Sequence, residues 1–205
     1  MIPSTTAVAE IEIPLAERGP SPRHVVVAYG FWLFLLSDII VFSALFAAYA
    51  VLVGRTDGGP TGVQLFHRDK VLAETGCLLL SSFACAMMSL AIDARRRGLT
   101  VLGALLTFAL GAAFVSLELG EFADMIAHGA GPSRSAFLSA FFALVGMHGL
   151  HVSIGLCWLV SMVAQVFTLG WRPMVIGRLA CFSLFWHALD IVWIGVFTIV
   201  YLGAR

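Results

Sequence analysis

The chain has 205 residues, of which 60% are hydrophobic and 12% are charged, and its mean hydropathy is +0.97. A soluble domain has about 45–50% apolar and about 25% charged residues, so this composition excludes an ordinary soluble domain and indicates an integral membrane protein. The formal net charge of +0 gives no global attraction to nucleic acid. The cysteines lie in apolar runs without a Cys-x-x-Cys pair, which argues against a disulfide framework and a thiolate metal site.

The first segment, residues 1–24, is rich in proline and glutamate. A signal peptide begins with basic residues and then becomes apolar, so this segment is not one. We predict that it forms an N-terminal arm on the cytoplasmic side.

The rest of the chain, residues 25–205, reads as a single transmembrane domain. A helix needs about 20 apolar residues to cross the hydrocarbon core, and turn-rich or charged stretches separate runs of that length. The expected fold is an all-α bundle of five transmembrane helices, without an internal repeat or a soluble domain. The predicted helices cover residues 25–53, 71–92, 99–122, 135–165 and 178–202.

The distribution of lysine and arginine sets the expected orientation. The side that holds the N-terminal arm carries seven of these residues and the opposite side carries five. Arg95–Arg97 lie in a very short loop, where the positive-inside rule is most reliable. We therefore expect the N-terminus in the cytoplasm and the C-terminus in the periplasm.

Ionisable side chains inside the apolar runs are expensive, at about 2.5–3.5 kcal/mol each near the bilayer centre. They should therefore face the bundle interior and not lipid. One group lies near the middle of its helices, and a second group lies near the outer helix ends. The first group is Asp38, His148, His151, His187 and Asp190, and the second is Glu74, Glu118 and Glu121.

Three interpretations of these residues compete: hydrogen bonds between helices, a proton or ion path, and a metal or haem site. The histidines could supply nitrogen ligands, and Glu118 and Glu121 could supply oxygen. However, carboxylate-bridged di-iron bundles use Glu-x-x-His, whereas this chain has only HxxH, HxxD and ExxE spacings. Trp186 and Trp193 share a helix face, and we expect them to be packing aromatics or to contact lipid in a cleft, and not to form a cofactor site.

Several segments resemble a known family. "GMHGLHVSIG", "LFWHALDIVWIGVFTIVYL" and "FWLFLLSDIIVFSALFAAYA" resemble the hallmark segments of subunit III of the haem-copper oxidases. "GPSRSAFLSAFFALVGMHGLHV" and "GGPTG" are most similar to the subunit of the cytochrome bo-type ubiquinol oxidases. The resemblance covers residues 25–205 and is collinear, and the quinol-oxidase form also has the shorter, five-helix layout.

The resemblance implies a non-catalytic subunit that binds no haem, copper or quinone and packs against subunit I, which holds the redox centres. It implies a phospholipid cleft, support of assembly and of sustained proton uptake, and a location in the bacterial inner membrane. The complex as a whole would oxidise ubiquinol, reduce oxygen to water and pump protons. Its partners would be subunit I, other oxidase subunits and phospholipid, with no nucleic acid.

One position departs from the family pattern, because Ser37-Asp38 stands where the family often has Ser-Glu with a carbodiimide-reactive glutamate. Because an unpaired ionisable group in hydrocarbon is costly and neighbouring helices offer partners, we expect Glu118 or Glu121 to pair with a histidine of residues 135–165. The alternatives are subunit III of a cytochrome c oxidase, a metal-dependent membrane enzyme, and an autonomous transporter coupled through Asp38 and Asp190. The transporter lacks support from inverted repeats or corresponding broken helices.

Overall fold

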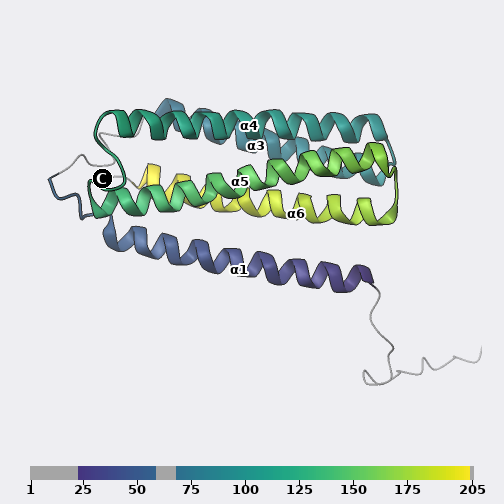
Figure 1. Ribbon diagram of the computed structural model, residues 1–205, viewed down its shortest axis with the longest axis horizontal. Helices are drawn as coiled ribbons and strands as arrows, with labels where there is room; N and C mark the ends of the chain where they lie inside the picture. Colours follow the sequence, from purple (N-terminus) through teal and green to yellow (C-terminus); the bar gives the residue numbers. More distant parts are fainter. Residues whose placement is uncertain (1–22, 59–67, 204–205) are drawn as a thin grey trace, which may run out of the picture.

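A computed structural model describes residues 23–58 and 68–203 (Figure 1). Within these residues the chain is helical, and five segments are long and apolar enough to cross a membrane. The final segment combines α6 with a π-helical end, η2. The bounds are α1 Arg23–Leu52, α3 Arg68–Asp93, α4 Arg97–Ala127, α5 Ala136–Thr168, α6 Pro173–Val196 and η2 Phe197–Leu202. The expectation of an all-helical protein with five candidate spans is therefore confirmed.

The helices that extend furthest beyond their predicted bounds are α4 and α6. α6 begins at Pro173, five residues before the predicted start, because proline is well suited to the first helical position, where its missing N–H would be unpaired anyway. α4 continues to Ala127, beyond the predicted end at residue 122, because Glu118 and Glu121 are buried in the bundle and the exposed Asp124 pairs with Lys70, so none of them ends the helix. α5 begins after Ser135, whose hydroxyl accepts a hydrogen bond from Leu138 N at 3.2 Å.

A tight turn joins α3 to α4. Arg95 N–H donates to Ile92 O and Arg96 N–H donates to Ala91 O, both at 2.9 Å. This is the hydrogen-bond pattern of a Schellman motif, whose left-handed residue is usually glycine. Here the position is occupied by Arg95, with φ 53°.

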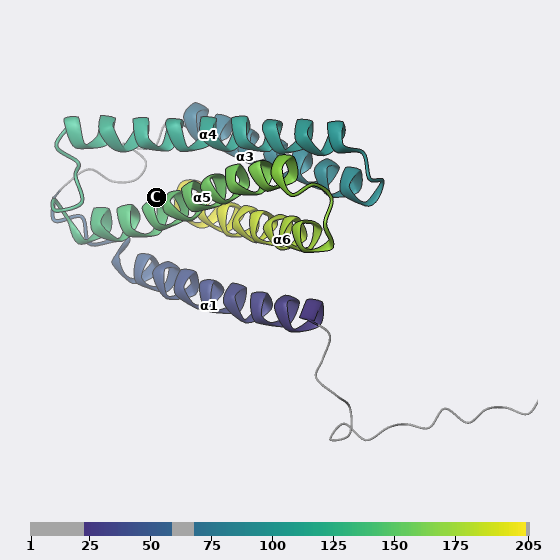
Figure 2. The same cartoon turned by 45° about the vertical axis from the view of Figure 1, so that its right-hand side comes forward.

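The helices pack side by side along one axis. α3 pairs with α4, α6 packs against both α3 and α5, and α1 contacts α5 and α6 at the edge of the bundle (Figure 2). Within the most apolar stretch of α1 only 11% of the residues are buried, against 50% for α6 and its π-helical end. The core therefore lies between α3, α4, α5 and α6, and α1 is the peripheral helix.

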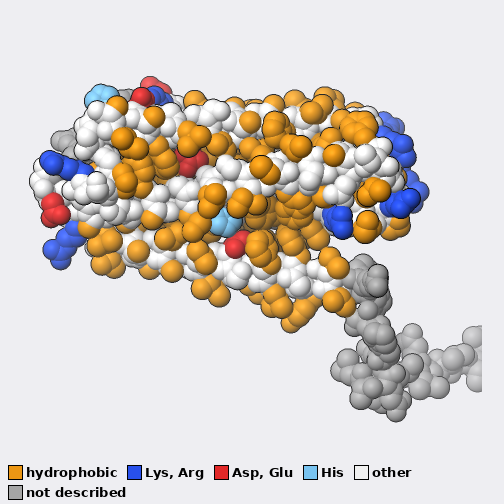
Figure 3. Space-filling view, in the orientation of Figure 1, with side chains coloured by type: hydrophobic (Ala, Val, Ile, Leu, Met, Phe, Trp, Pro, Cys, Tyr) orange, Lys and Arg blue, Asp and Glu red, His pale blue; other side chains and the backbone are white. Residues whose placement is uncertain are grey.

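Hydrophobic side chains cover the flank of the molecule, and the lysine and arginine side chains visible from this side gather at its two ends (Figure 3). This distribution suits a chain whose flank faces hydrocarbon and whose ends face water. The start of α1 and the end of η2 lie at opposite ends of the bundle (Figure 1). Residues 1–22 of the predicted N-terminal arm lie outside the described residues, so the arm and its boundary stay a prediction.

Candidate functional site

The largest group of buried polar contacts joins α3 to α6, and we call it the α3–α6 seam. Its indole contacts run from Trp186 Nε1 to Ser81 Oγ at 3.0 Å and from Trp193 Nε1 to Thr75 Oγ1 at 3.1 Å. Both tryptophans are only 1% exposed. The expectation that they line a lipid cleft is therefore wrong: each indole fills the protein core and directs its N–H to a hydroxyl on the neighbouring helix.

The seam continues through His187 and Ser183. Ser82 Oγ lies 2.7 Å from His187 Nδ1. Asp190, one helical turn beyond His187, is buried, and within the described residues neither of its carboxylate oxygens has a hydrogen-bond partner. Ser89 donates a hydrogen bond to Ser183 Oγ at 3.0 Å. His187 is thus half-buried and bonded to α3, whereas Asp190 is buried on the same helix face without a hydrogen bond of its own among the described residues.

A second polar group lies at the end of the bundle where α3 begins and α4 ends, and we call it the carboxylate cluster. Its members are Glu74, Glu118, Glu121 and Tyr201. The three glutamates are buried and interact electrostatically with one another. Tyr201 donates a hydrogen bond to Glu121 Oε2 at 3.0 Å. Three helical segments, α3, α4 and η2, therefore meet at one group of carboxyls, since the tyrosine comes from η2.

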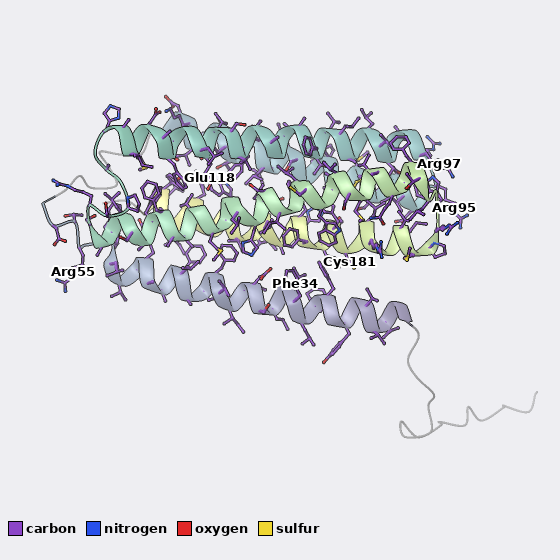
Figure 4. The ribbon with its side chains drawn as sticks, viewed as in Figure 1. Phe34, Arg55, Arg95, Arg97, Glu118 and Cys181 are labelled. Atoms are coloured by element: carbon purple, nitrogen blue, oxygen red, sulfur yellow. The ribbon has the colours of Figure 1, made fainter. Side chains whose placement is uncertain are left out.

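Glu118 occupies a space that a glycine leaves open. Its side chain lies between α4 and α5 (Figure 4), and a Cβ built on Gly149 would collide with both of its carboxylate oxygens. A Cβ on Gly146, one turn earlier, would meet only Phe122 at an ordinary 3.6 Å. Gly149 is therefore the position on α5 that admits a buried carboxyl between the two helices.

An ion pair lies beside this cluster at the end of the bundle. Lys70 Nζ lies 2.6 Å from Asp124 Oδ2, and both side chains are exposed. Lys70 also interacts electrostatically with Glu74 and Glu121. A positive charge beside the buried carboxyls thus comes from the first turn of α3, at the edge of the apolar region.

His148 is enclosed by aromatic rings and not by carboxylates. Its ring centroid lies 5.6 Å from that of Phe114 and 5.2 Å from that of Trp193, with Phe42 at 6.4 Å. Within the described part of the chain neither ring nitrogen has a hydrogen-bond partner. For His148, the hypothesis that Glu118 or Glu121 pairs with a histidine of this helix is therefore wrong, because neither carboxyl bonds to its ring nitrogens.

His151, one turn along α5, faces the peripheral helix. Its Nδ1 lies 2.8 Å from Met147 O, and its Nε2 lies 3.8 Å from Asp38 Oδ1 of α1. The Asp38 side chain is 21% exposed. The histidine that does pair with a carboxylate therefore uses the aspartate of α1, so this contact joins α1 to the core.

This arrangement suits adhesion between helices better than ligand binding. In residues 23–58 and 68–203, no three histidine, cysteine, aspartate or glutamate side chains converge as a metal site would require. The histidines are separated by their partners: Ser82 for His187, Asp38 for His151 and aromatic rings for His148. These residues therefore do not form one cofactor pocket.

The hydroxyl residues of the seam and Tyr201 were not among the predicted site residues. A periodic signal for the seam is present, because Thr75, Ser82 and Ser89 recur every seven residues on one face of α3. Tyr201 offers no such signal, because a tyrosine near a helix end normally indicates the membrane–water interface.

Comparison with known proteins gives consistent matches. The family model described as cytochrome c oxidase subunit III matches residues 22–204. Proteins named cytochrome bo(3) ubiquinol oxidase subunit 3 from Pseudomonas aeruginosa and Pseudomonas putida are each 53% identical over 176 residues, covering 85% and 84% of this chain and 83% and 84% of the relatives. A quinol oxidase subunit 3 from Bacillus subtilis is 43% identical over 176 residues, covering 84% of this chain and 85% of its own. The collinear helices, the buried carboxyls between them and these matches lead to one conclusion: the chain belongs to the cytochrome c oxidase subunit III family of the haem-copper oxidases.

Proposed function

We propose that this chain is the non-catalytic third subunit of a proton-pumping haem-copper ubiquinol oxidase. The observation that carries the proposal is the 53% identity, over 176 residues, to proteins named as subunit 3 of a ubiquinol oxidase. The alternative is a complex that takes its electrons from cytochrome c, because the family model is described as cytochrome c oxidase subunit III. In this proposal the haems and copper lie in subunit I, and ubiquinol is the substrate of the complex.

The role of this chain is to pack against subunit I and the other oxidase subunits, with phospholipid covering the remaining apolar flank. The support is the amount of apolar surface that the single chain leaves open, above all on α1. Ile40 is 70% exposed, and Val51 and Tyr29 are exposed to a similar degree. A bacterial inner membrane is the setting that such a respiratory subunit requires.

The buried polar residues act in this proposal as struts that set the positions of the helices. The struts join pairs of helices: the seam joins α3 to α6, and Asp38 and His151 join α1 to α5. Glu118 fills the space between α4 and α5, where neither of its oxygens has a hydrogen-bond partner among the described residues. Hydrogen bonds between transmembrane helices contribute about 0.6 kcal/mol on average. Several together therefore fix the arrangement, although each one alone is dispensable for insertion.

The proposed orientation places the α3–α4 turn in the cytoplasm and the loop before α5 in the periplasm. It is supported by the cluster of Arg95–Arg97 in a very short connection. A cysteine introduced at Ser133 should react with a membrane-impermeant maleimide added to intact cells, whereas one at Leu169 should react only after the cells are opened. The reverse pattern would overturn the orientation.

Affinity purification of the full chain from native membranes tests the function. We expect it to copurify with a larger haem-containing subunit and to show oxygen consumption with ubiquinol but not with reduced cytochrome c. Oxygen consumption with reduced cytochrome c but not with ubiquinol would show that cytochrome c is the electron donor. A chain that purifies without any haem protein would overturn the assignment to an oxidase.

A further inference from the structure

A groove runs along the surface between α3 and α4 at the end of the bundle that carries Arg95–Arg97. It has a volume of about 590 Å³ and an almost entirely apolar lining. Leucine, methionine and phenylalanine side chains form its walls, and small residues form its floor. Arg96 is the charged residue of its lining, so the groove has one polar end.

The groove exists because α3 and α4 approach each other closely beneath it. A Cβ on Gly103 would lie 2.8 Å from Met88 Cβ and 3.2 Å from Ala84 O. With the backbones this close, the leucines that flank the contact, such as Leu102 and Leu106, project past it toward the surface, where they are exposed. The floor is therefore fixed by backbone packing and does not depend on flexible side chains closing over it.

The polar end of the groove is built from arginines held in a strained turn. Arg95 adopts a left-handed conformation that glycine adopts more easily, and the turn directs three consecutive arginines to this end of the bundle, with Asp93 as the acidic residue beside them. Arg97 lines a second hollow, of about 310 Å³, on the other side of α4. Positive charge thus lies at the mouths of two hollows on either side of one helix.

The length of the groove matches one leaflet of a bilayer. From Leu99 to Leu110 the lining residues of α4 span about 16 Å at about 1.5 Å per residue, and half of the hydrocarbon core is about 15 Å. An acyl chain that starts at the level of Arg96 would therefore end near the bilayer midplane, where the groove ends.

We propose that the α3–α4 groove is a binding site for an anionic glycerophospholipid, with one acyl chain in the groove and the phosphate on Arg96. This lipid site rests on the proposed function in one respect, which is that the turn with Arg95–Arg97 lies at a membrane surface. It does not depend on whether the electron donor is ubiquinol or cytochrome c. Charge complementarity selects an anionic headgroup, because each arginine near a membrane surface contributes attraction to anionic lipid.

The test is native mass spectrometry of the purified complex after exchange into equal amounts of phosphatidylglycerol and phosphatidylcholine with identical acyl chains. Wild type should retain phosphatidylglycerol preferentially, and Arg96→Gln should lower that preference about fivefold. The side chain of Arg96 makes no helix-cap hydrogen bond, so the change removes charge and not a cap. Arg172→Gln, at the same end but outside the groove, is the matched control, because Arg172 also lacks a cap hydrogen bond.

Equal losses in both variants, or no headgroup preference in wild type, would overturn the proposal. The haem spectrum and subunit content of the same samples report the proposed function separately. A second measurement identifies the occupant directly: a photoreactive benzoylphenylalanine at Leu102 should form adducts richer in anionic lipid than one at Leu119, which is exposed on α4 outside the groove. Cross-linking of Leu102 to another oxidase subunit would show that a protein helix fills the groove and would overturn the lipid site.

Discussion

Substitution of Gly149 by alanine should loosen the contact between α4 and α5. The added Cβ collides with the carboxylate of Glu118, which is 2% exposed and cannot move out to solvent. Overpacking of a filled interior typically costs about 1–3 kcal/mol, while replacing a helical glycine by alanine contributes a gain of up to about 1 kcal/mol. With the full gain in helix propensity, the net loss in free energy of unfolding for Gly149→Ala should therefore be about 0–2 kcal/mol.

The control is Gly146→Ala on the same helix, where the new Cβ has an ordinary contact. Because both changes gain the same helix propensity, the difference between them isolates the collision, which should be about 1–3 kcal/mol. Unfolding of the purified chain in mixed detergent micelles measures both. Glu118→Ala in the Gly149→Ala background should recover most of the collision energy. Equal stabilities for the two alanine variants would refute the close contact between Glu118 and α5.

Three further changes test other features. Leu144→Ala, at a fully buried position, should cost about 2–5 kcal/mol in unfolding free energy, whereas His148→Leu should cost less than about 2 kcal/mol because it breaks no hydrogen bond; the opposite order would point to an ionic partner for the histidine. A lipid-soluble carbodiimide should modify Asp38 before Glu118, since the first side chain is partly exposed and the second is buried; peptide mass spectrometry after short reaction times checks this order. Arg95→Gly should leave the thermal unfolding midpoint unchanged or raised, because glycine suits the left-handed turn; a lowered midpoint would contradict the strain.

The helices are predictable from sequence because length and apolar composition alone define a transmembrane segment. The position of each polar residue along its helix is predictable for the same reason, and Glu118 and Glu121 lie together in the carboxylate cluster at one end of the bundle. The end of α4 was less predictable, because Asp124 resembles the polar residues that follow a span. In the structure it is still helical and pairs with Lys70 across the α3–α4 interface.

The sequence does not predict which side chain each buried polar residue contacts. A buried histidine at a given depth can meet a carboxylate, a hydroxyl or aromatic rings, and which one it meets depends on helix rotation and order. His148 and His151 are one turn apart on α5, yet one is enclosed by Phe114 and Trp193 and the other faces Asp38. The tryptophans illustrate the same limit, since only the position of α3 distinguishes a core indole from a lipid-facing one.

The peripheral position of α1 has a consequence for biosynthesis. Domains are made from the N-terminus onward, so α1 enters the membrane first, although the helices it contacts, α5 and α6, are made last. Until α5 arrives with His151, Asp38 has no access to this partner, and α1 must remain inserted by its own apolar residues. Its mean hydropathy of 2.2 is the highest of the five spans. A high hydropathy keeps a helix stably inserted while a carboxyl near its middle still lacks its partner on α5.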